Sequence, residues 1–230
     1  MSTIAVIIPA FNEAPSIAHV IQAIPKHVTT CIVVDNNSTD DTALLAKESG
    51  AIVLHESQKG YGHACLKGMA YLEKHPPDIV VFLDGDFSDF PEDLDSLVTP
   101  LLQDEAVFCL GARTKSLREK GSLTPQQRFG NALACTLMRW IYGGTFTDLG
   151  PFRAIQWKVL KTLDMQDKTY GWTIEMQLKI LRRKLPYKEI PVRYRKRIGV
   201  SKVSGTLKGT VLAGIKIIGW IGKFYFSKWS

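Results

Sequence analysis

The sequence has no charge-free hydrophobic run that approaches the roughly 18 residues needed to span a membrane. Its most apolar stretch, residues 207–226, is interrupted by Lys208, Lys216 and Lys223. The early apolar run Ile4–Ile8 is too short, and too uncharged at its start, for a secretory signal peptide. We therefore expect neither a membrane-spanning helix nor export, and we expect a cytoplasmic protein.

Cysteine is scarce, and its spacing is unlike that of a metal site. The 230 residues contain four cysteines, Cys31, Cys65, Cys109 and Cys135, none of them closely paired. This pattern excludes a zinc ribbon, an iron–sulfur cluster and a disulfide-dense secreted scaffold. It favours a reducing compartment.

Acidic residues are the minority among the charged ones. There are 29 Lys and Arg against 22 Asp and Glu, which gives a formal charge of +7 and a pI near 9.2. A basic protein favours anionic partners such as nucleotides, lipid phosphates or nucleic acid. Nucleic acid is the least compatible of these, because acidic residues follow three of the expected strands and would repel a phosphate backbone unless a metal intervened.

Short β-branched runs recur through the first half of the chain, and helix-compatible segments separate most of them. The runs are Ile4–Ile8, Cys31–Val34, Ile52–Leu54, Ile79–Leu83 and Val107–Leu110. This alternation predicts a largely parallel α/β sheet. Ligands of such sheets bind beyond the carboxyl ends of the strands, so the residues that follow each run are the candidates for a site.

Those following residues are polar and include several carboxylates. Asp84 and Asp86 come directly after the fourth run, where their oxygens could bind a divalent cation together with substrate phosphates. The alternative for this pair is an exposed turn. Asp35 follows the second run and could accept hydrogen bonds from a nucleobase, although the loop that it begins also suits helix capping.

A glycine-rich segment, Lys59–Ala64, only loosely resembles a phosphate-binding loop, because it lacks the spacing of a P-loop or a dinucleotide fingerprint. We expect it to provide close backbone packing beside a bound donor. A sugar-nucleotidyltransferase would carry a glycine-rich, arginine-bearing loop after its first strand. Pro9–Glu13 stands there instead, which makes that class a weaker alternative.

The second half offers helices and basic segments. We expect a basic loop over Arg113–Gly130, helices over Asn131–Tyr142 and Trp172–Arg183, and an imperfectly amphipathic C-terminal helix. The predicted division is a catalytic domain at 1–205 and an apolar, basic helical tail at 206–230. The tail could lie on a membrane surface, pack on the domain or form a dimer contact.

Taken together, four segments resemble the inverting glycosyltransferases of family 2: Ile8–Glu13, Val34–Thr42, Lys59–Gly62 and Asp84–Asp86. The resemblance implies a GT-A fold, with a Rossmann-like, mostly parallel central sheet flanked by helices. It also implies a nucleotide-sugar donor bound by Pro9, Ala10, Asn12, Glu13, Asp35, Asn37, Lys59, Asp84 and Asp86. Asp84 and Asp86 are then the ligands of Mg²⁺ or Mn²⁺ at the diphosphate.

Three later segments are similar to the dolichyl-phosphate mannose and glucose synthases. Asp148–Arg153 resembles their Asp-x-x-(Ser)-Gly-Phe-Arg signature, with Pro151 in place of a glycine. Tyr170–Met176 is similar to their next helix, and Arg193–Lys202 to the segment that closes over the diphosphate and the acceptor phosphate.

This hypothesis gives roles to further residues. The catalytic candidates are Asp86, Glu175 and Arg153, and the candidates for binding acceptor or diphosphate are Arg113, Arg128, Arg153, Arg197 and Lys202. Glu175 is either a general base or a group that orients an arginine or the donor.

The predicted reaction moves a hexose from a donor of the UDP-glucose or GDP-mannose type to a polyprenyl or dolichyl phosphate. It takes place at the cytoplasmic face of a membrane, to which the protein binds peripherally. The alternative acceptor is the hydroxyl of a soluble compound or a saccharide, and that reaction requires a base. The sequence does not set the oligomeric state.

Overall fold

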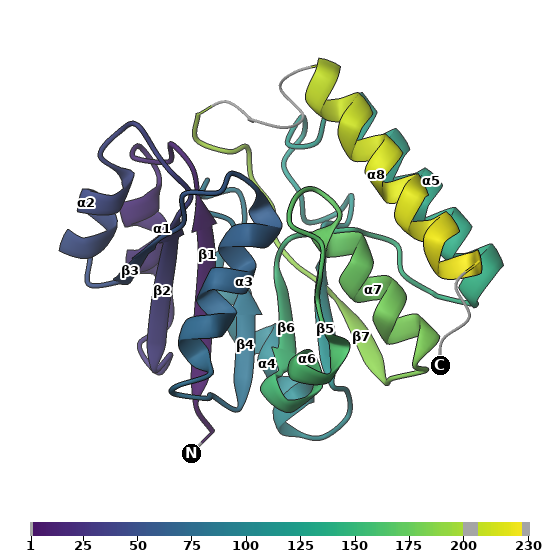
Figure 1. The fold of residues 1–230 in the computed structure, drawn as a ribbon, viewed down its shortest axis with the longest axis horizontal. Helices are drawn as coiled ribbons and strands as arrows, with labels where there is room; N and C mark the ends of the chain where they lie inside the picture. The colour runs from purple at the N-terminus through teal and green to yellow at the C-terminus, as the bar shows by residue number, and fades with distance from the viewer. Residues whose placement is uncertain (1, 200–206, 227–230) are drawn as a thin grey trace.

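A computed structural model of the chain describes residues 2–199 and 207–226. It shows one twisted sheet with helices packed on both of its faces (Figure 1). The two faces form two separate hydrophobic cores, because alternate residues of each strand point to opposite sides. In the first strand, Ala5 and Ile7 belong to one core, and Ile4, Val6 and Ile8 belong to the other.

The sheet has seven strands in the order β3-β2-β1-β4-β6-β5-β7. Their bounds are β1 Ile4–Ala10, β2 Thr30–Asp35, β3 Ile52–His55, β4 Ile79–Phe82, β5 Phe108–Ala112, β6 Arg153–Gln156 and β7 Tyr187–Pro191. All pairings are parallel except those of β6, which runs antiparallel to both β4 and β5. The sequence located the first five strands correctly and missed β6 and β7.

The helices are α1 Ile17–Ala23, α2 Thr42–Glu48, α3 Tyr61–Leu72, α4 Leu94–Leu102, α5 Pro125–Tyr142, α6 Trp157–Leu163, α7 Trp172–Arg182 and α8 Leu207–Phe226, and a short 3₁₀ turn covers Pro91–Asp93. The predicted loop over Arg113–Gly130 is wrong in its last part, because α5 already begins at Pro125. Thr124 and Gln127 form a reciprocal capping box there, and proline suits the first helical position.

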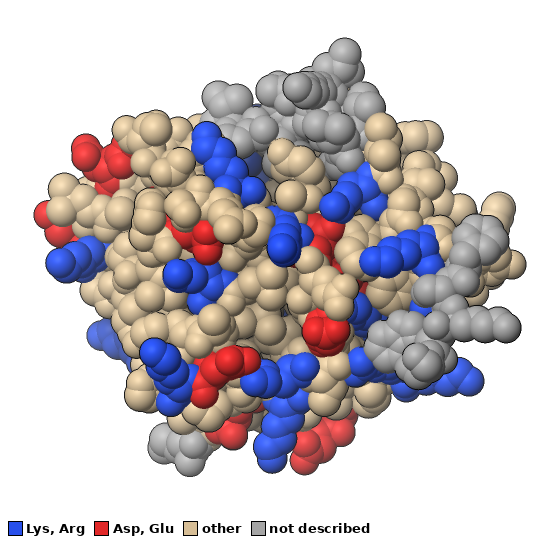
Figure 2. All heavy atoms as spheres, in the orientation of Figure 1, with Lys and Arg blue, Asp and Glu red and all other residues tan. Residues whose placement is uncertain are grey.

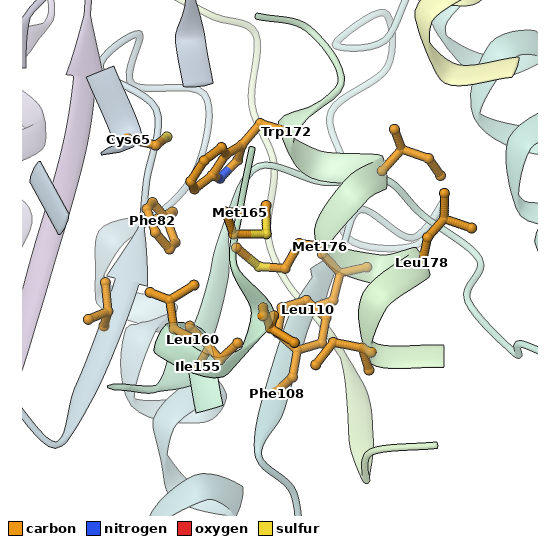
Figure 3. Packing of buried hydrophobic residues seen from close by; sticks show 14 of the residues in the cluster. Cys65, Phe82, Phe108, Leu110, Ile155, Leu160, Met165, Trp172, Met176 and Leu178 are labelled. Atoms are coloured by element: carbon orange, nitrogen blue, oxygen red, sulfur yellow. The ribbon is translucent and has the colours of Figure 1, made fainter. Parts of the chain in front are cut away.

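The larger core lies between the sheet and helices α3, α5, α6 and α7. Figure 3 shows Phe82, Phe108 and Ile155 of the central strands facing Trp172 and Met176 of α7. Full burial of such side chains stabilises the fold by about 1.5–3 kcal/mol each. This packing fixes α7 on the sheet, and with it the loop 164–171 that leads into α7.

The C-terminal helix α8 lies along α5 at one end of the molecule (Figure 1). The Tyr142 hydroxyl donates to the Ile221 carbonyl at 2.7 Å, and Trp220, Ile221 and Phe224 are buried in the larger core. The predicted division at residues 205 and 206 stays a prediction, but α8 packs as part of the domain. Within residues 2–199 and 207–226, none of the helices combines the length and apolarity required to cross a membrane.

Candidate active site

The carboxyl ends of β1 and β4, two adjacent parallel strands, open into a cavity of about 280 Å³. Six of the nine predicted donor-binding residues line it: Pro9, Ala10, Glu13, Lys59, Asp84 and Asp86. Tyr170 and Arg197, from the second half of the chain, complete the wall. The structure thus brings together residues that are up to 188 positions apart in the sequence, from Pro9 to Arg197.

The other three predicted donor residues, Asn12, Asp35 and Asn37, are not on the wall of this cavity. The Asn12 side-chain oxygen accepts a hydrogen bond from the Thr39 backbone at 2.8 Å. Asp35 is 4% exposed and lies 3.1 Å from His55 Nδ1. Their contacts support the loop that follows β2, and their role in binding the nucleoside stays a prediction.

Asn36, which the sequence did not single out, lines the cavity instead. Its amide donates to the Gln58 carbonyl at 2.7 Å, and its oxygen accepts from the Gly60 backbone at 2.7 Å. Asn36 therefore ties the loop after β2 to the glycine-rich segment. The position of Asn36 two residues after the predicted strand Cys31–Val34 was the available signal.

The two aspartates of the Asp-Gly-Asp turn lie on the floor of the cavity. Asp86 is 4% exposed and accepts a hydrogen bond from the Ser88 backbone at 2.9 Å. Asp84 has one buried carboxylate oxygen, Oδ1, without a hydrogen-bond partner in the described part of the chain. Burial, followed by the charge of Asp86, raises the pKa of Asp84 to about 7.

These two carboxylates fit a hard divalent cation. Both offer only oxygen, and the unpartnered Oδ1 of Asp84 is a free ligand atom. Residues 2–199 and 207–226 contain no group of three or more His, Cys, Asp and Glu arranged around one point. A Mg²⁺ or Mn²⁺ ion here would therefore complete its coordination with phosphate oxygens and water, as Mg²⁺ commonly does.

Arg197 is the cation closest to the aspartates. Its guanidinium pairs with Asp86 Oδ2 at 3.0 Å and with Glu13 Oε1 at 2.9 Å. The backbone around it is fixed to the same turn, because the Ile198 amide donates to the Asp86 carbonyl at 3.0 Å. The segment after β7 thus contacts the Asp-Gly-Asp turn, and its closure over the diphosphate and the acceptor phosphate stays a prediction. Lys202, the other candidate in that segment, lies outside the described residues.

Arg153 and Glu175, both predicted to be catalytic, are fully buried and lie on no cavity wall that we find. Arg153 donates to the Thr173 carbonyl at 3.0 Å and to the Gly150 carbonyl, and burial lowers its pKa to about 10. Glu175 accepts from the backbone amide of Asp167 at 2.7 Å and pairs with Lys179 at 2.7 Å. Both side chains hold neighbouring backbone in place, and their catalytic role stays a prediction.

The remaining arginine candidates line a second, larger cavity of about 660 Å³ beside β5 and α5. Arg113 forms a bidentate pair with Asp148, with N–O distances of 2.8 and 2.7 Å. Arg128, Lys115 and Arg118 add three further cations. Lys115 and Arg118 were not singled out, although they lie in the stretch predicted to be a basic loop.

Charge on the molecular surface is dispersed. On the face drawn in Figure 2, basic side chains are scattered among acidic ones and form no continuous stripe. An extended nucleic-acid interface would require such a stripe. The visible face therefore gives no support to nucleic acid as a partner.

Comparison with known proteins gives a consistent result. The model of the glycosyl transferase family 2 matches residues 5–189. An uncharacterized glycosyltransferase from Mycobacterium tuberculosis is 33% identical over 212 residues, which cover 91% of this chain and 94% of that protein. The UDP-N-acetylglucosamine–dolichyl-phosphate N-acetylglucosaminyltransferase of Methanococcus voltae is 27% identical over 210 residues, covering 81% of this chain and 83% of the relative.

Among solved structures, glucosyl-3-phosphoglycerate synthase from Mycobacterium tuberculosis, in complex with Mn²⁺, UDP-glucose and phosphoglyceric acid, is similar to this chain. The TM-score is 0.79 at 25% identity, with 100% of this chain and 82% of the other covered. The mixed, mostly parallel sheet flanked by helices is the GT-A fold, which confirms the fold predicted from the sequence.

Proposed function

The chain belongs to glycosyl transferase family 2, and from this membership we propose that it transfers a hexose from a nucleoside-diphosphate sugar to the phosphate of a polyprenyl or dolichyl lipid. One observation carries the proposal. Asp84, Asp86 and Arg197 line both the donor cavity and an adjoining cavity that leads toward α8. A donor diphosphate and an acceptor can therefore meet at these three side chains.

On the donor side, Asp84 and Asp86 would hold Mg²⁺ or Mn²⁺. When bound, the cation would offset the negative charge that grows on the departing diphosphate. Arg197 lies at the same point and adds positive charge from a fixed position. The donor base and sugar stay as first predicted, with the UDP-glucose and GDP-mannose types as candidates. The similar structure bound to UDP-glucose supports the first.

On the acceptor side, the burial of Glu175 favours a nucleophile that needs no general base. A lipid phosphate oxygen is already anionic near neutral pH, whereas a hydroxyl must lose a proton as it attacks. Arg113 lines the same inner cavity as Asp84 and Asp86 and could fix an acceptor phosphate through its fork of N–H groups. The dolichyl-phosphate acceptor named for the Methanococcus voltae relative supports this choice.

A soluble phosphorylated acceptor is the second candidate. The cavity lined by Arg113, Lys115, Arg118 and Arg128 could bind a small multivalent anion. The similar structure in complex with phosphoglyceric acid supports this alternative. Such an acceptor would present a hydroxyl, and its reaction would need a base other than Glu175.

The proposal includes peripheral membrane binding by the surface that α5 and α8 form together. Phe129 and Trp140 on α5 are 72% and 79% exposed, and Ile215 and Ile218 on α8 are 63% and 52% exposed. Neither helix contains Asp or Glu. Exposed apolar side chains beside basic ones suit an anionic lipid surface. We therefore regard 1–205 as the catalytic domain and 206–230 as its membrane-facing helix.

The test is a panel of UDP- and GDP-sugars combined with undecaprenyl phosphate, dolichyl phosphate or phosphoglycerate, with Mn²⁺ or Mg²⁺ and a chelator control. Glycosylated lipid that disappears with chelator supports the proposal. A product from phosphoglycerate alone would replace the lipid acceptor with the soluble one. Release of nucleoside diphosphate that does not respond to chelator would contradict the metal site.

A further inference from the structure

Two connected cavities lead from the paired aspartates to the outer side of α8. The inner one encloses about 340 Å³ and extends from Asp84 and Asp86 to Gly214 and Ile217 of α8. The outer one, of about 520 Å³, lies between loop 164–171 and α8. Thr169 and Tyr170 line both, so the two cavities adjoin at this loop and together outline a path. Each volume is in the range of small-molecule sites, about 300–1,000 Å³.

The lining of this path changes from ionic to largely apolar. Asp84, Asp86, Arg113 and Arg197 stand at the inner end. Leu149, Pro151, Trp172 and Ile217 also line the inner cavity, beside the polar side chains of Gln126, Gln127, Asn131 and Thr173. Tyr170, Ile215 and Trp220 line the outer one, where Lys216 and Lys223 are the charged residues. Such a gradient matches a molecule with an anionic head and a hydrocarbon chain.

The outer cavity is held open by buried contacts. Asp167 is 2% exposed, and its Oδ2 accepts a hydrogen bond from the Trp220 indole at 2.6 Å and pairs with Lys216 at 3.2 Å. Its Oδ1 accepts from the backbone amides of Thr169 at 2.7 Å and Gly171 at 3.0 Å. Asp167 thus fixes loop 164–171 to α8, and the groove between them exists before any ligand binds.

Two glycines of α8 leave space beside the two cavities. Gly214 lines the inner cavity and Gly219 the outer one, and a Cβ atom built on either would meet nothing within 4 Å. A side chain at Gly219 would therefore project without a clash into space where a ligand chain could lie. Gly222 also has open space around it but lines neither cavity, which makes it a matched control.

We infer that the groove between loop 164–171 and α8 binds the hydrocarbon chain of the acceptor, with the acceptor phosphate at Arg113 and Arg197. The inference rests on the proposed lipid-phosphate acceptor and deepens it. The chain leaves the reaction centre past Pro151 and Ile217 and passes over Trp220 toward the exposed side of α8. Binding of the isoprene units beyond the second in the outer cavity, which geranyl phosphate is too short to fill, gives the enzyme a preference for long acceptors.

The experiment compares kcat/KM for undecaprenyl phosphate and geranyl phosphate in the wild type, Gly219→Leu and Gly222→Leu, all as full-length chains. We expect Gly219→Leu to lower the preference for undecaprenyl phosphate about tenfold, which corresponds to about 1.4 kcal/mol. Its activity with geranyl phosphate and its donor KM should stay close to wild type. Gly222→Leu should keep the wild-type preference, because any gain in helix propensity is common to both variants.

The outcomes separate the two proposals. If the wild type glycosylates neither prenyl phosphate, the proposed function fails, and the groove assignment fails with it. If it glycosylates both, and Gly219→Leu retains the wild-type preference, the groove assignment is overturned while the lipid acceptor stands. An equal loss in Gly222→Leu would also overturn it, because the effect would then belong to α8 in general.

Discussion

At the scale of single residues, the site keeps charged groups in surroundings that disfavour charge. Asp84 is half-buried beside Asp86, and its buried Oδ1 has no partner within the described residues. Arg113, in contrast, is half-buried and pairs with Asp148 through Nε and Nη2. The unpartnered Oδ1 of Asp84 is the atom that a cation would bind, so we expect the free-energy cost of burying it to be recovered when the donor complex forms.

Replacing Asp84 by Asn should therefore stabilise the metal-free protein. The folded-state pKa of about 7 lies above the unfolded value near 3.9, so folding becomes less favourable as pH rises between these values. The gain from Asp84→Asn should be absent near pH 4, grow toward pH 7 and stay constant above it. We expect Tm to rise by roughly 4 °C or more at pH 8, measured by thermal unfolding.

The control is the same scan with Mn²⁺. Manganese should raise the Tm of the wild type and leave that of Asp84→Asn unchanged. A variant that gains no stability at pH 8, or gains the same amount at pH 5, would show that Asp84 is not held in an unfavourable charged state.

Asp86→Asn should abolish transfer while leaving the fold intact. Asn retains a side-chain oxygen for the Ser88 amide but loses the charge that pairs with Arg197. We expect kcat to fall at least about 100-fold, comparable to the loss of one preorganised electrostatic group, with a Tm close to wild type. Steady-state assays of nucleoside diphosphate release would measure this, and near-normal turnover would rule out the assigned role of Asp86.

The sequence identified residues of the site where strand geometry determines their position. Asp84, Asp86 and Glu13 follow parallel strands, whose carboxyl ends share one edge of the sheet. The catalytic roles given to Arg153 and Glu175 stay predictions, and their full burial was not foreseen because a motif reveals residue type but not burial. The pairing of Arg113 with Asp148 joins residues 35 positions apart through tertiary contact, which local patterns do not encode.

At the scale of elements, the two strands that the sequence analysis missed, β6 and β7, show where hydrophobic periodicity fails to predict a strand. β6, with the sequence Arg-Ala-Ile-Gln, has only four residues, and two of them are polar. It becomes a strand because β4 and β5 hold it from both sides. β7 is similarly polar and lies at the edge of the sheet. Both depend on long-range pairing, whereas the first five strands have continuous apolar runs.

Loop 164–171 is the element that connects the donor cavity with α8. On one side its backbone approaches α3 so closely that a Cβ at Gly62 would lie 1.9 Å from the Asp167 carbonyl oxygen. On the other side the Asp167 carboxylate accepts the hydrogen bond of the Trp220 indole. Tyr170, which lines the donor cavity, belongs to this loop. The glycine-rich segment thus provides the close backbone packing that the sequence predicted.

Trp220→Phe should break the hydrogen bond between α8 and loop 164–171 without leaving a large cavity in the core. Phenylalanine keeps most of the packing area but lacks the indole N–H group, which donates a hydrogen bond to Asp167. We expect a loss of about 1–3 kcal/mol in the free energy of unfolding, because a buried acceptor loses a partner. The donor KM should rise several-fold, since Tyr170 is positioned by the same loop.

Trp157→Phe is the matched control for Trp220→Phe. Trp157 is 7% exposed and belongs to the same core, but it is the first residue of α6 and not part of α8. It should lower stability to a similar extent with no change in donor KM. Equal effects of the two variants on KM would show that Trp220 acts only through general stability.

At the scale of the whole molecule, α5 and α8 place their exposed apolar residues at one end, and α2 lies at the opposite end (Figure 1). The tail cannot be removed cleanly to test its function, because Trp220, Ile221 and Phe224 are part of the larger core. Single substitutions on the exposed side of α5 and α8 test membrane binding more specifically than a deletion of the tail. They change the surface and leave the core packed.

Trp140→Glu and Ile218→Glu should each weaken binding to vesicles that contain anionic lipid by about tenfold or more. Each removes an apolar side chain whose burial is worth about 1.5–3 kcal/mol and adds a charge that the anionic surface repels. Leu44→Glu on α2 is the control, because it replaces a side chain that is 54% exposed with the same charge at the far end. Cosedimentation would measure all three, and equal losses would show that net charge alone is responsible.

The ion pair between Glu13 and Arg197 joins residues 184 positions apart. On a ribosome that adds about 5–20 residues per second, Glu13 is made roughly 10–40 seconds before Arg197. Throughout that interval the nascent chain has the acidic half of the site without its guanidinium partner. On the proposed function, the site therefore lacks this guanidinium until Arg197 has been translated, and a polypeptide that terminates before Arg197 would lack it at the donor diphosphate.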